Sequence, residues 1–385
     1  MDTGEEHLSP GKTVPGTPDT TQEAHTTGRG AFRVPVVDIS PWTGAGTEAG
    51  TDDRRERVTR EVDTAAREVG FIQVTGHGID SRTWDGLADA LDAFFLRDLE
   101  LKKKVATPPE INRGYSPPKS ERLSLSLGVE SADGMNDFFE AFNIGVQASD
   151  FPDLHLPEAD YPANVWPQET DGGMAVFREN LERWFSEAQR VARTLTDIFE
   201  VALEVPRGTL AELTDHSIDV LRTINYALEP GQAVELDGEL NGMGEHTDYG
   251  IVTVLWADRV EGLQVLGEDG GWHDVMPDPG ALLVNLGDVT ARLTNDRWKS
   301  TLHRVKPPVV DGTIRRRRSA AFFHDGNVDA VVGPLPGTVD EDRPARYRPM
   351  TVGEHVARKL AGSRALELND TDTMSEAQRV LASKR

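Results

Sequence analysis

The chain has 385 residues, no cysteine and a formal net charge of −24 at pH 7. This length allows a large hydrophobic core that needs neither disulfides nor a structural metal. The absence of thiols excludes disulfides, thiolate zinc sites and cysteine nucleophiles, and the acidity disfavours binding to nucleic acids or to anionic membranes.

The N-terminal segment has the composition of a polar tail. It lacks the basic and apolar stretches of a secretion signal, and no run in the chain approaches the ~18 apolar residues of a membrane-spanning helix. We therefore expect a cytoplasmic protein. Residues 1–30 contain too few large apolar side chains to offset the entropy of ordering, so we expect a disordered tail there.

Residues 31–205 have the pattern of an α+β region dominated by helices. Apolar residues recur at helical spacing, and Ser81 is well placed to cap one of the helices. An irregular stretch at 108–167 is of the kind that often covers an active site. In chain order, the predicted elements are a strand at 33–37, a helix at 51–69, a strand at 71–74, a helix that starts at Ser81 and a long helix at 177–199.

Residues 206–348 change to short β-like runs separated by Gly, Asp and Pro. This spacing is typical of an antiparallel double sheet or jelly roll, so we predict a mainly β core flanked by helices. Residues 349–385 should form a C-terminal helix, near 352–360, and a polar tail. The core strands are predicted at 222–226, 251–255, 263–266, 282–285, 301–305 and 320–323.

His246 and Asp248 are the first candidates for a functional site. They stand two residues apart before a predicted strand, so an extended backbone turns both side chains to the same face, whereas a helix would separate them by about 200°. His303 lies in a second predicted strand, which a jelly roll can place beside the first. Two imidazoles and one carboxylate can occupy one face of Fe(II) and leave positions for a co-substrate and dioxygen. A zinc hydrolase with the same ligands would need a general base, for which Glu245 is the obvious candidate.

Five further motifs, at 71–79, 113–115, 137–145, 285–288 and 294–305, extend the pattern over most of the chain. Together with the histidines and the aspartate, they resemble the Fe(II)/2-oxoglutarate-dependent oxygenases of the isopenicillin N synthase-like family. The resemblance implies a double-stranded β-helix, a cupin-like jelly roll. It also implies an iron at one mouth of the barrel, with His246, Asp248 and His303 as its ligands.

The resemblance further implies a site for 2-oxoglutarate. An Arg-x-Ser motif binds the distal carboxylate in this family, and Arg317 with Ser319 fits it, because a guanidinium matches a carboxylate in shape and charge. Tyr226 matches a family tyrosine that often contacts the same ligand. Alternation along a strand would turn Arg316 and Arg318 to the opposite face, as solvated charges.

Membership of this family would make the chain an oxygenase that uses Fe(II), 2-oxoglutarate and O2 and releases succinate and CO2. The carboxylate of Asp248 favours hydroxylation, desaturation or cyclisation, because related halogenases have a small residue there. The expected substrate is a small molecule, such as a secondary metabolite (for example an antibiotic) or an amino-acid derivative. The alternatives are an isopenicillin N synthase-like iron oxidase that does not use 2-oxoglutarate and a non-catalytic ligand-binding module on the same fold.

Beyond the metal centre we expect no catalytic side chain, because iron and co-substrate carry the chemistry in such enzymes. We expect no nucleic-acid or membrane partner, and a monomer or weak homo-oligomer. The candidates for substrate binding are Asn225, Tyr249, Phe323 and Tyr115.

Overall fold

The computed structural model describes residues 32–44, 51–108, 110–121, 125, 139–168, 170, 172–227, 242–306, 309–310 and 313–363. Apart from Phe32, these residues belong to one unit, Arg33–Arg385. The tail expected at 1–30 and the polar tail expected after the last helix lie outside the described residues.

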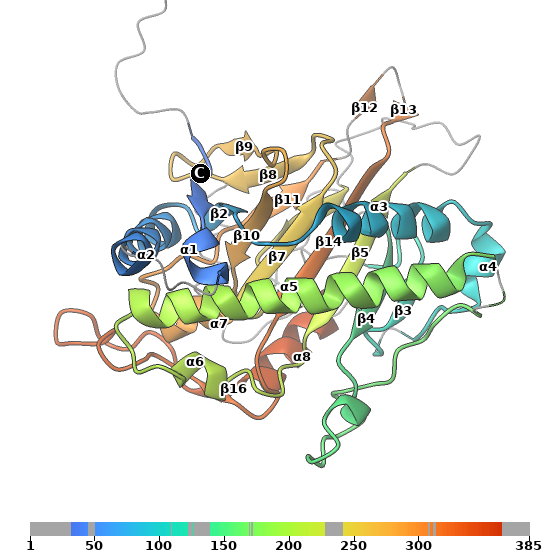
Figure 1. Cartoon of the computed structure of the whole chain (residues 1–385). Coiled ribbons are helices and arrows are strands. Elements are labelled where there is room, and N and C mark those ends of the chain that lie inside the picture. The colour runs from blue at the N-terminus through green and yellow to red at the C-terminus, as the bar shows by residue number, and fades with distance from the viewer. Residues whose placement is uncertain are drawn as a thin grey trace, which may run out of the picture. The chain divides into compact units, whose positions relative to one another are not determined.

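Two β-sheets form the centre of this unit (Figure 1). The strands of the larger sheet follow the order β1-β2-β10-β7-β14-β5-β4-β3, and those of the smaller sheet the order β6-β11-β8-β9. All their pairings are antiparallel except that of β1 with β2, so the predicted mainly β jelly-roll core is confirmed. The larger sheet consists of β1 (Val36–Asp38), β2 (Phe71–Thr75), β3 (Gly114–Ser116), β4 (Glu140–Gly145), β5 (Val220–Tyr226), β7 (Val252–Ala257), β10 (Leu282–Leu286) and β14 (Arg317–His324). The smaller sheet consists of β6 (Met243–His246), β8 (Leu263–Leu266), β9 (Trp272–Asp274) and β11 (His303–Val305).

Two short ribbons lie outside these sheets within the described residues. They pair β12 with β13 and β15 with β16, both antiparallel. Their bounds are β12 (Val309–Val310), β13 (Thr313–Ile314), β15 (Val331–Val332) and β16 (Met350–Thr351).

Helices cover one face of the larger sheet. The long helix α5 crosses this face and packs against β7, β14, α2 and α3 (Figure 1). Its predicted apolar stripe, which includes Phe177, Leu181, Trp184, Leu195 and Phe199, is buried. None of the described helices combines the length and the apolar character that crossing a lipid bilayer requires. The helices are α1 (Ser40–Thr43), α2 (Thr51–Glu68), α3 (Ser81–Phe95), α4 (Leu99–Lys103), α5 (Met174–Ala202), α6 (Thr209–Glu212), α7 (Asp288–Leu293) and α8 (Val352–Ser363), with a single 3₁₀ turn at Ala148–Asp150 among the elements named here.

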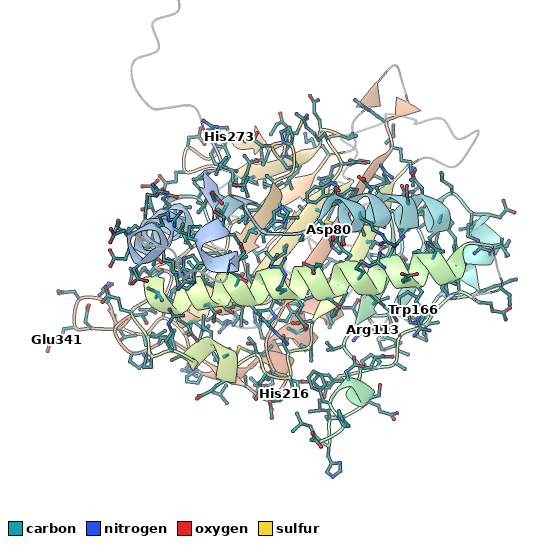
Figure 2. All side chains as sticks on the ribbon, in the orientation of Figure 1. Asp80, Arg113, Trp166, His216, His273 and Glu341 are labelled. Atoms are coloured by element: carbon teal, nitrogen blue, oxygen red, sulfur yellow. The ribbon has the colours of Figure 1, made fainter. Side chains whose placement is uncertain are left out.

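The start of α3 differs by one residue from the prediction. Asp80 rather than Ser81 caps the helix, because the backbone of Asp80 is extended and its carboxylate accepts a hydrogen bond from the Thr83 amide at 2.7 Å. Asp80 lies at the N-terminal end of α3 in Figure 2. This hydrogen bond also holds the pKa of the Asp80 carboxyl below its usual value.

Candidate active site

His246, Asp248 and His303 meet at the junction of β6 and β11. His246 ends β6, His303 begins β11, and the two are cross-strand partners whose ring centroids lie 4.2 Å apart. Asp248 follows β6 and places its Oδ1 3.9 Å from His246 Nε2 and 3.7 Å from His303 Nε2. All three side chains are buried. The structure therefore brings together the three residues that the sequence singled out.

Hydrogen bonds set the orientation of both imidazoles. Nδ1 of His246 donates to the carbonyl oxygen of Gly244 at 2.8 Å, and Nδ1 of His303 donates to that of Thr301 at 3.1 Å. Each bond fixes the tautomer, so that Nε2 carries a lone pair and points toward Asp248. Burial, and after it the neighbouring His303, lowers the pKa of His246 to about 3, so this imidazole is neutral at ordinary pH.

The carboxylate of Asp248 is held in the same manner. Its outer oxygen, Oδ2, accepts hydrogen bonds from the Asn285 amide at 2.6 Å and from the Thr253 hydroxyl at 2.5 Å. Its inner oxygen, Oδ1, faces the two histidines. These hydrogen bonds hold the Asp248 side chain in one orientation, so it needs little rearrangement when a metal ion binds.

The three inward atoms fit a single metal ion. Two ligand atoms on one ion with bonds of ~2.1 Å cannot be more than about 4.2 Å apart. The distances of 3.7 and 3.9 Å from Asp248 Oδ1 to the two Nε2 atoms meet this limit. They are also too long for direct hydrogen bonds. Two imidazoles and one carboxylate on one side of an ion are the donor set expected for non-haem Fe(II).

Arg317 and Ser319 lie on β14, next to Tyr226 on β5. Arg317 is opposite Tyr226 in the register, and its guanidinium carbon lies 5.4 Å from the centre of the tyrosine ring. The side chain is buried, with Nη1 3.5 Å from the Ser319 hydroxyl. Among the described residues, Nε of Arg317 has no hydrogen-bond partner and no carboxylate forms an ion pair with this arginine. A buried cation in this condition is suited to an anionic ligand.

The other arginines of the run point elsewhere. Arg315 is exposed, whereas Arg316 and Arg318 both donate to Oδ1 of Asp92 on α3, at 2.5 and 2.8 Å. Alternation along β14 thus separates Arg317 from its neighbours, as predicted. The expectation that Arg316 and Arg318 are solvated charges is wrong, because α3 covers this face of the sheet and supplies a carboxylate to pair with them.

One cavity connects the three-residue cluster with Arg317. It encloses about 1020 Å³ of space between protein atoms, its mouth included. Tyr249 and Phe323, two of the residues proposed from the sequence to bind substrate, line this cavity. Most of the remaining wall is apolar, with contributions from Phe71, Ile224, Leu255, Leu263 and Val305.

Helix α8 closes part of this cavity. Val356, Leu360 and Ser363 on one side of the helix line the wall. On a neighbouring side, buried Lys359 pairs with the buried carboxylate of Asp288 at 3.1 Å. The helix is therefore attached to the protein by an ion pair next to its cavity-lining side chains.

Two of the predicted substrate contacts are not brought to the cavity. The Asn225 amide donates to Glu140 Oε1 at 2.8 Å, and the Tyr115 hydroxyl donates to Glu140 Oε2 at 2.6 Å. Neither residue belongs to the cavity lining. Asn225 is adjacent to Tyr226 on β5, so strand alternation turns it to the opposite face. Tyr115 packs in the core against Phe94.

Arg222 and Asp325 are among the polar residues of the cavity that the sequence analysis did not propose. Arg222 lies on the same face of β5 as Tyr226, and the strand period alone could have identified it. Glu121 reaches the cavity from the irregular stretch at 108–167, where the loop from Asn112 to Glu121 is expected to supply pocket residues; its pairing with Arg222 was not expected. Asp325 follows β14, and burial, with Asp219 and Asp248 nearby, raises the pKa of its carboxyl well above the usual value.

Comparison with known proteins agrees with this geometry. Residues 34–169 match the family described as the N-terminal region of non-haem dioxygenase in morphine synthesis, and residues 219–326 match the 2OG-Fe(II) oxygenase superfamily. The 2-oxoglutarate-Fe(II) type oxidoreductase hxnY of Emericella nidulans is 32% identical over 327 residues, which are 84% of this chain and 88% of that protein. Clavatol oxidase claD of Penicillium crustosum is 30% identical over 348 residues, 87% of this chain and 98% of that protein.

Solved structures show the same likeness. A full-length Neurospora crassa protein, crystallised with alpha-KG and thymine, has a TM-score of 0.72 and 25% sequence identity, and the match covers 86% of this chain and 96% of that chain. The chain therefore belongs to the 2OG-Fe(II) oxygenase superfamily. It is an Fe(II)- and 2-oxoglutarate-dependent oxygenase that uses O2, as its sequence predicted, and members of this family act on small molecules.

Proposed function

We propose that the chain oxidises a C–H bond of a small molecule at an Fe(II) ion bound by His246, Asp248 and His303. The convergence of two Nε2 atoms and Oδ1 carries this proposal, because hydrogen bonds occupy the opposite atom of each side chain. Among the described residues, this is the group of histidines and carboxylates that is close enough to hold a metal ion. The carboxylate of Asp248 supports hydroxylation, desaturation or cyclisation.

In the same proposal, Arg317, Ser319 and Tyr226 hold 2-oxoglutarate. The guanidinium would donate to the distal carboxylate, and the two hydroxyl groups are near enough on the adjacent strands to assist. When bound, Fe(II), 2-oxoglutarate and O2 would supply the oxidising chemistry: O2 is the oxidant, and 2-oxoglutarate is converted to succinate and CO2. The chain itself binds and orients the reactants, and its apolar walls exclude water from them.

The cavity supports a small and largely apolar substrate, which we propose is a secondary metabolite or an amino-acid derivative. Relatives named clavatol oxidase and, at 29% identity, homoarginine-6-hydroxylase of Oryza sativa act on compounds of these two kinds. The net charge of −24 supports a function without nucleic acid. We propose a monomer or weak homo-oligomer in the cytoplasm, where Fe(II) and 2-oxoglutarate are supplied by metabolism.

Anaerobic reconstitution tests the proposed metal ligands. The wild-type protein should retain Fe(II) after desalting, and Asp248→Ala should retain less than about one tenth as much, because loss of a ligand weakens binding more than the 10- to 100-fold that loss of a supporting residue does. Asp340→Ala, at a surface ion pair, is the matched control. Equal iron retention by all three proteins would contradict the assignment. Release of succinate during turnover separates this function from an oxidase that does not use 2-oxoglutarate.

A further inference from the structure

A buried ion pair lies in the cavity at a distance from the proposed 2-oxoglutarate site. Nη2 of Arg222 donates to Oε2 of Glu121 at 2.8 Å, and the side chains are only 10% and 5% exposed. Both residues line the cavity. A buried pair of this kind is often no more stabilising than apolar residues of the same size, so its position in a ligand cavity indicates recognition rather than stability.

The place of Arg222 on β5 separates it from the 2-oxoglutarate site. Arg222 and Tyr226 share one face of the strand and lie about 13 Å apart at ~3.3 Å per residue. The ring of Phe139 stands between them, 5.1 Å from the Arg222 guanidinium and in edge contact with Tyr226 at 5.9 Å. Because Arg317 is opposite Tyr226, each arginine has its own section of the cavity. Arg222 is therefore placed to meet the substrate.

The partners of Arg222 also fix its orientation. Glu121 holds one end of the guanidinium, and Phe139 packs against its plane. Opposite Arg222 on β14 is Ala321, whose small side chain leaves room on the cavity side. A donor and an acceptor are thus presented side by side, with little freedom to rearrange.

We propose that the Arg222–Glu121 pair recognises a neutral substrate that carries an N–H and a C=O next to each other, as a cyclic amide does. This inference rests on the proposed function of the cavity as a substrate site. The guanidinium would donate to the C=O, and the carboxylate would accept from the N–H. A negatively charged group would be repelled by Glu121 and a positively charged group by Arg222. Either charge would leave the buried site unbalanced, which a neutral amide does not.

Binding of matched probes tests this inference. The protein is loaded anaerobically with Fe(II) and 2-oxoglutarate, the visible charge-transfer band of that complex is recorded, and probe binding is then measured by calorimetry. Dihydroquinolinone should bind at least about tenfold more tightly than its N-methyl derivative, which lacks the N–H donor. The affinity for dihydroquinolinone should also exceed the affinities for the charged probes hydrocinnamate, phenylpropylamine and phenylalanine by a similar factor. Equal binding of the N-methyl derivative, or a preference for a charged probe, would overturn the inference.

The two steps of this experiment distinguish two failures. Absence of the charge-transfer band would count against the proposed function of the cavity. A normal band without preference for the amide would count only against the role of Arg222 and Glu121.

Substitution of either partner should change the charge preference. In Glu121→Gln the site gains a net positive charge, so the affinity for hydrocinnamate relative to dihydroquinolinone should rise at least about tenfold. In Arg222→Gln the relative affinity for phenylpropylamine should rise instead. A ratio of affinities is insensitive to a loss of folded protein, and Arg343→Gln, at a surface ion pair with Asp340, should leave both ratios unchanged. Unchanged ratios in both cavity variants would refute the proposal.

Discussion

Replacement of Arg317 by alanine should weaken the binding of 2-oxoglutarate far more than the same change at Arg315. A hydrogen bond to a charged group contributes about 1.5–3 kcal/mol, and a guanidinium can form two with one carboxylate. The loss is therefore roughly 3–6 kcal/mol, which corresponds to an increase of about 10²- to 10⁴-fold in the dissociation constant. Arg315 is exposed and lies two residues before β14 begins, so Arg315→Ala should change the constant by less than about twofold.

The dissociation constant can be measured by anaerobic titration of the Fe(II)-loaded protein, with the charge-transfer absorbance as the signal. Arg317→Lys is an informative intermediate, because lysine keeps the charge but loses the planar fork. The melting temperature of each variant shows whether the fold is retained. Similar constants for Arg317→Ala and Arg315→Ala in folded proteins would refute the reasoning, since they would show that the buried guanidinium does not bind the co-substrate.

Three further predictions concern the surroundings of the iron site. Asn285→Ala should lower the affinity for Fe(II) about 10- to 100-fold, because it removes a hydrogen bond to Asp248 Oδ2; competition with a chelator measures this, and an unchanged affinity would contradict it. Lys359→Ala should lower the free energy of unfolding by about 3–5 kcal/mol, because it removes the buried cation beside Asp288; a change below about 1 kcal/mol in urea denaturation would argue against it. Burial lowers the pKa of His355 to about 3, so the folded protein binds this proton less readily than the unfolded chain, in which the pKa is near 6.5. Stability should therefore be complete above about pH 6.5 and fall toward pH 3, by up to about 1.4 kcal/mol per pH unit, and His355→Gln should flatten the dependence of Tm on pH; an unaltered slope would exclude this origin.

The strand period was the most reliable guide to the site in the sequence. It placed His246 and Asp248 on one face and separated Arg317 from Arg316 and Arg318, and the structure has the same arrangement. The same rule, applied to β5, excludes Asn225 because Tyr226 faces the cavity. The expectation that Asn225 contacts the substrate was therefore wrong, because neighbouring residues of a strand face opposite sides of the sheet.

Other features depend on contacts that no local pattern encodes. Glu121 meets Arg222 only because a loop folds over β5, and the two are far apart in the sequence. Tyr115 lies in a family-like motif, yet β3 is paired with β4 so that its hydroxyl meets Glu140. The predicted N-cap of α3 was wrong by one residue. Asp80 and Ser81 are both good capping residues, and only the backbone conformation decides between them.

Two neighbouring sides of helix α8 have different roles: one lines the cavity, and the other attaches the helix to the rest of the protein. Val356 and Leu360 shape the cavity, while Lys359 is tied to Asp288, whose carboxylate also accepts a hydrogen bond from Thr247 at 3.0 Å. Thr247 lies between the proposed ligands His246 and Asp248 in the sequence, so these contacts connect α8 to the segment that carries two of the iron ligands. For protein engineering, positions 356 and 360 can therefore be varied to change the size of the cavity. Smaller side chains there should admit bulkier compounds while the geometry of the iron site is retained.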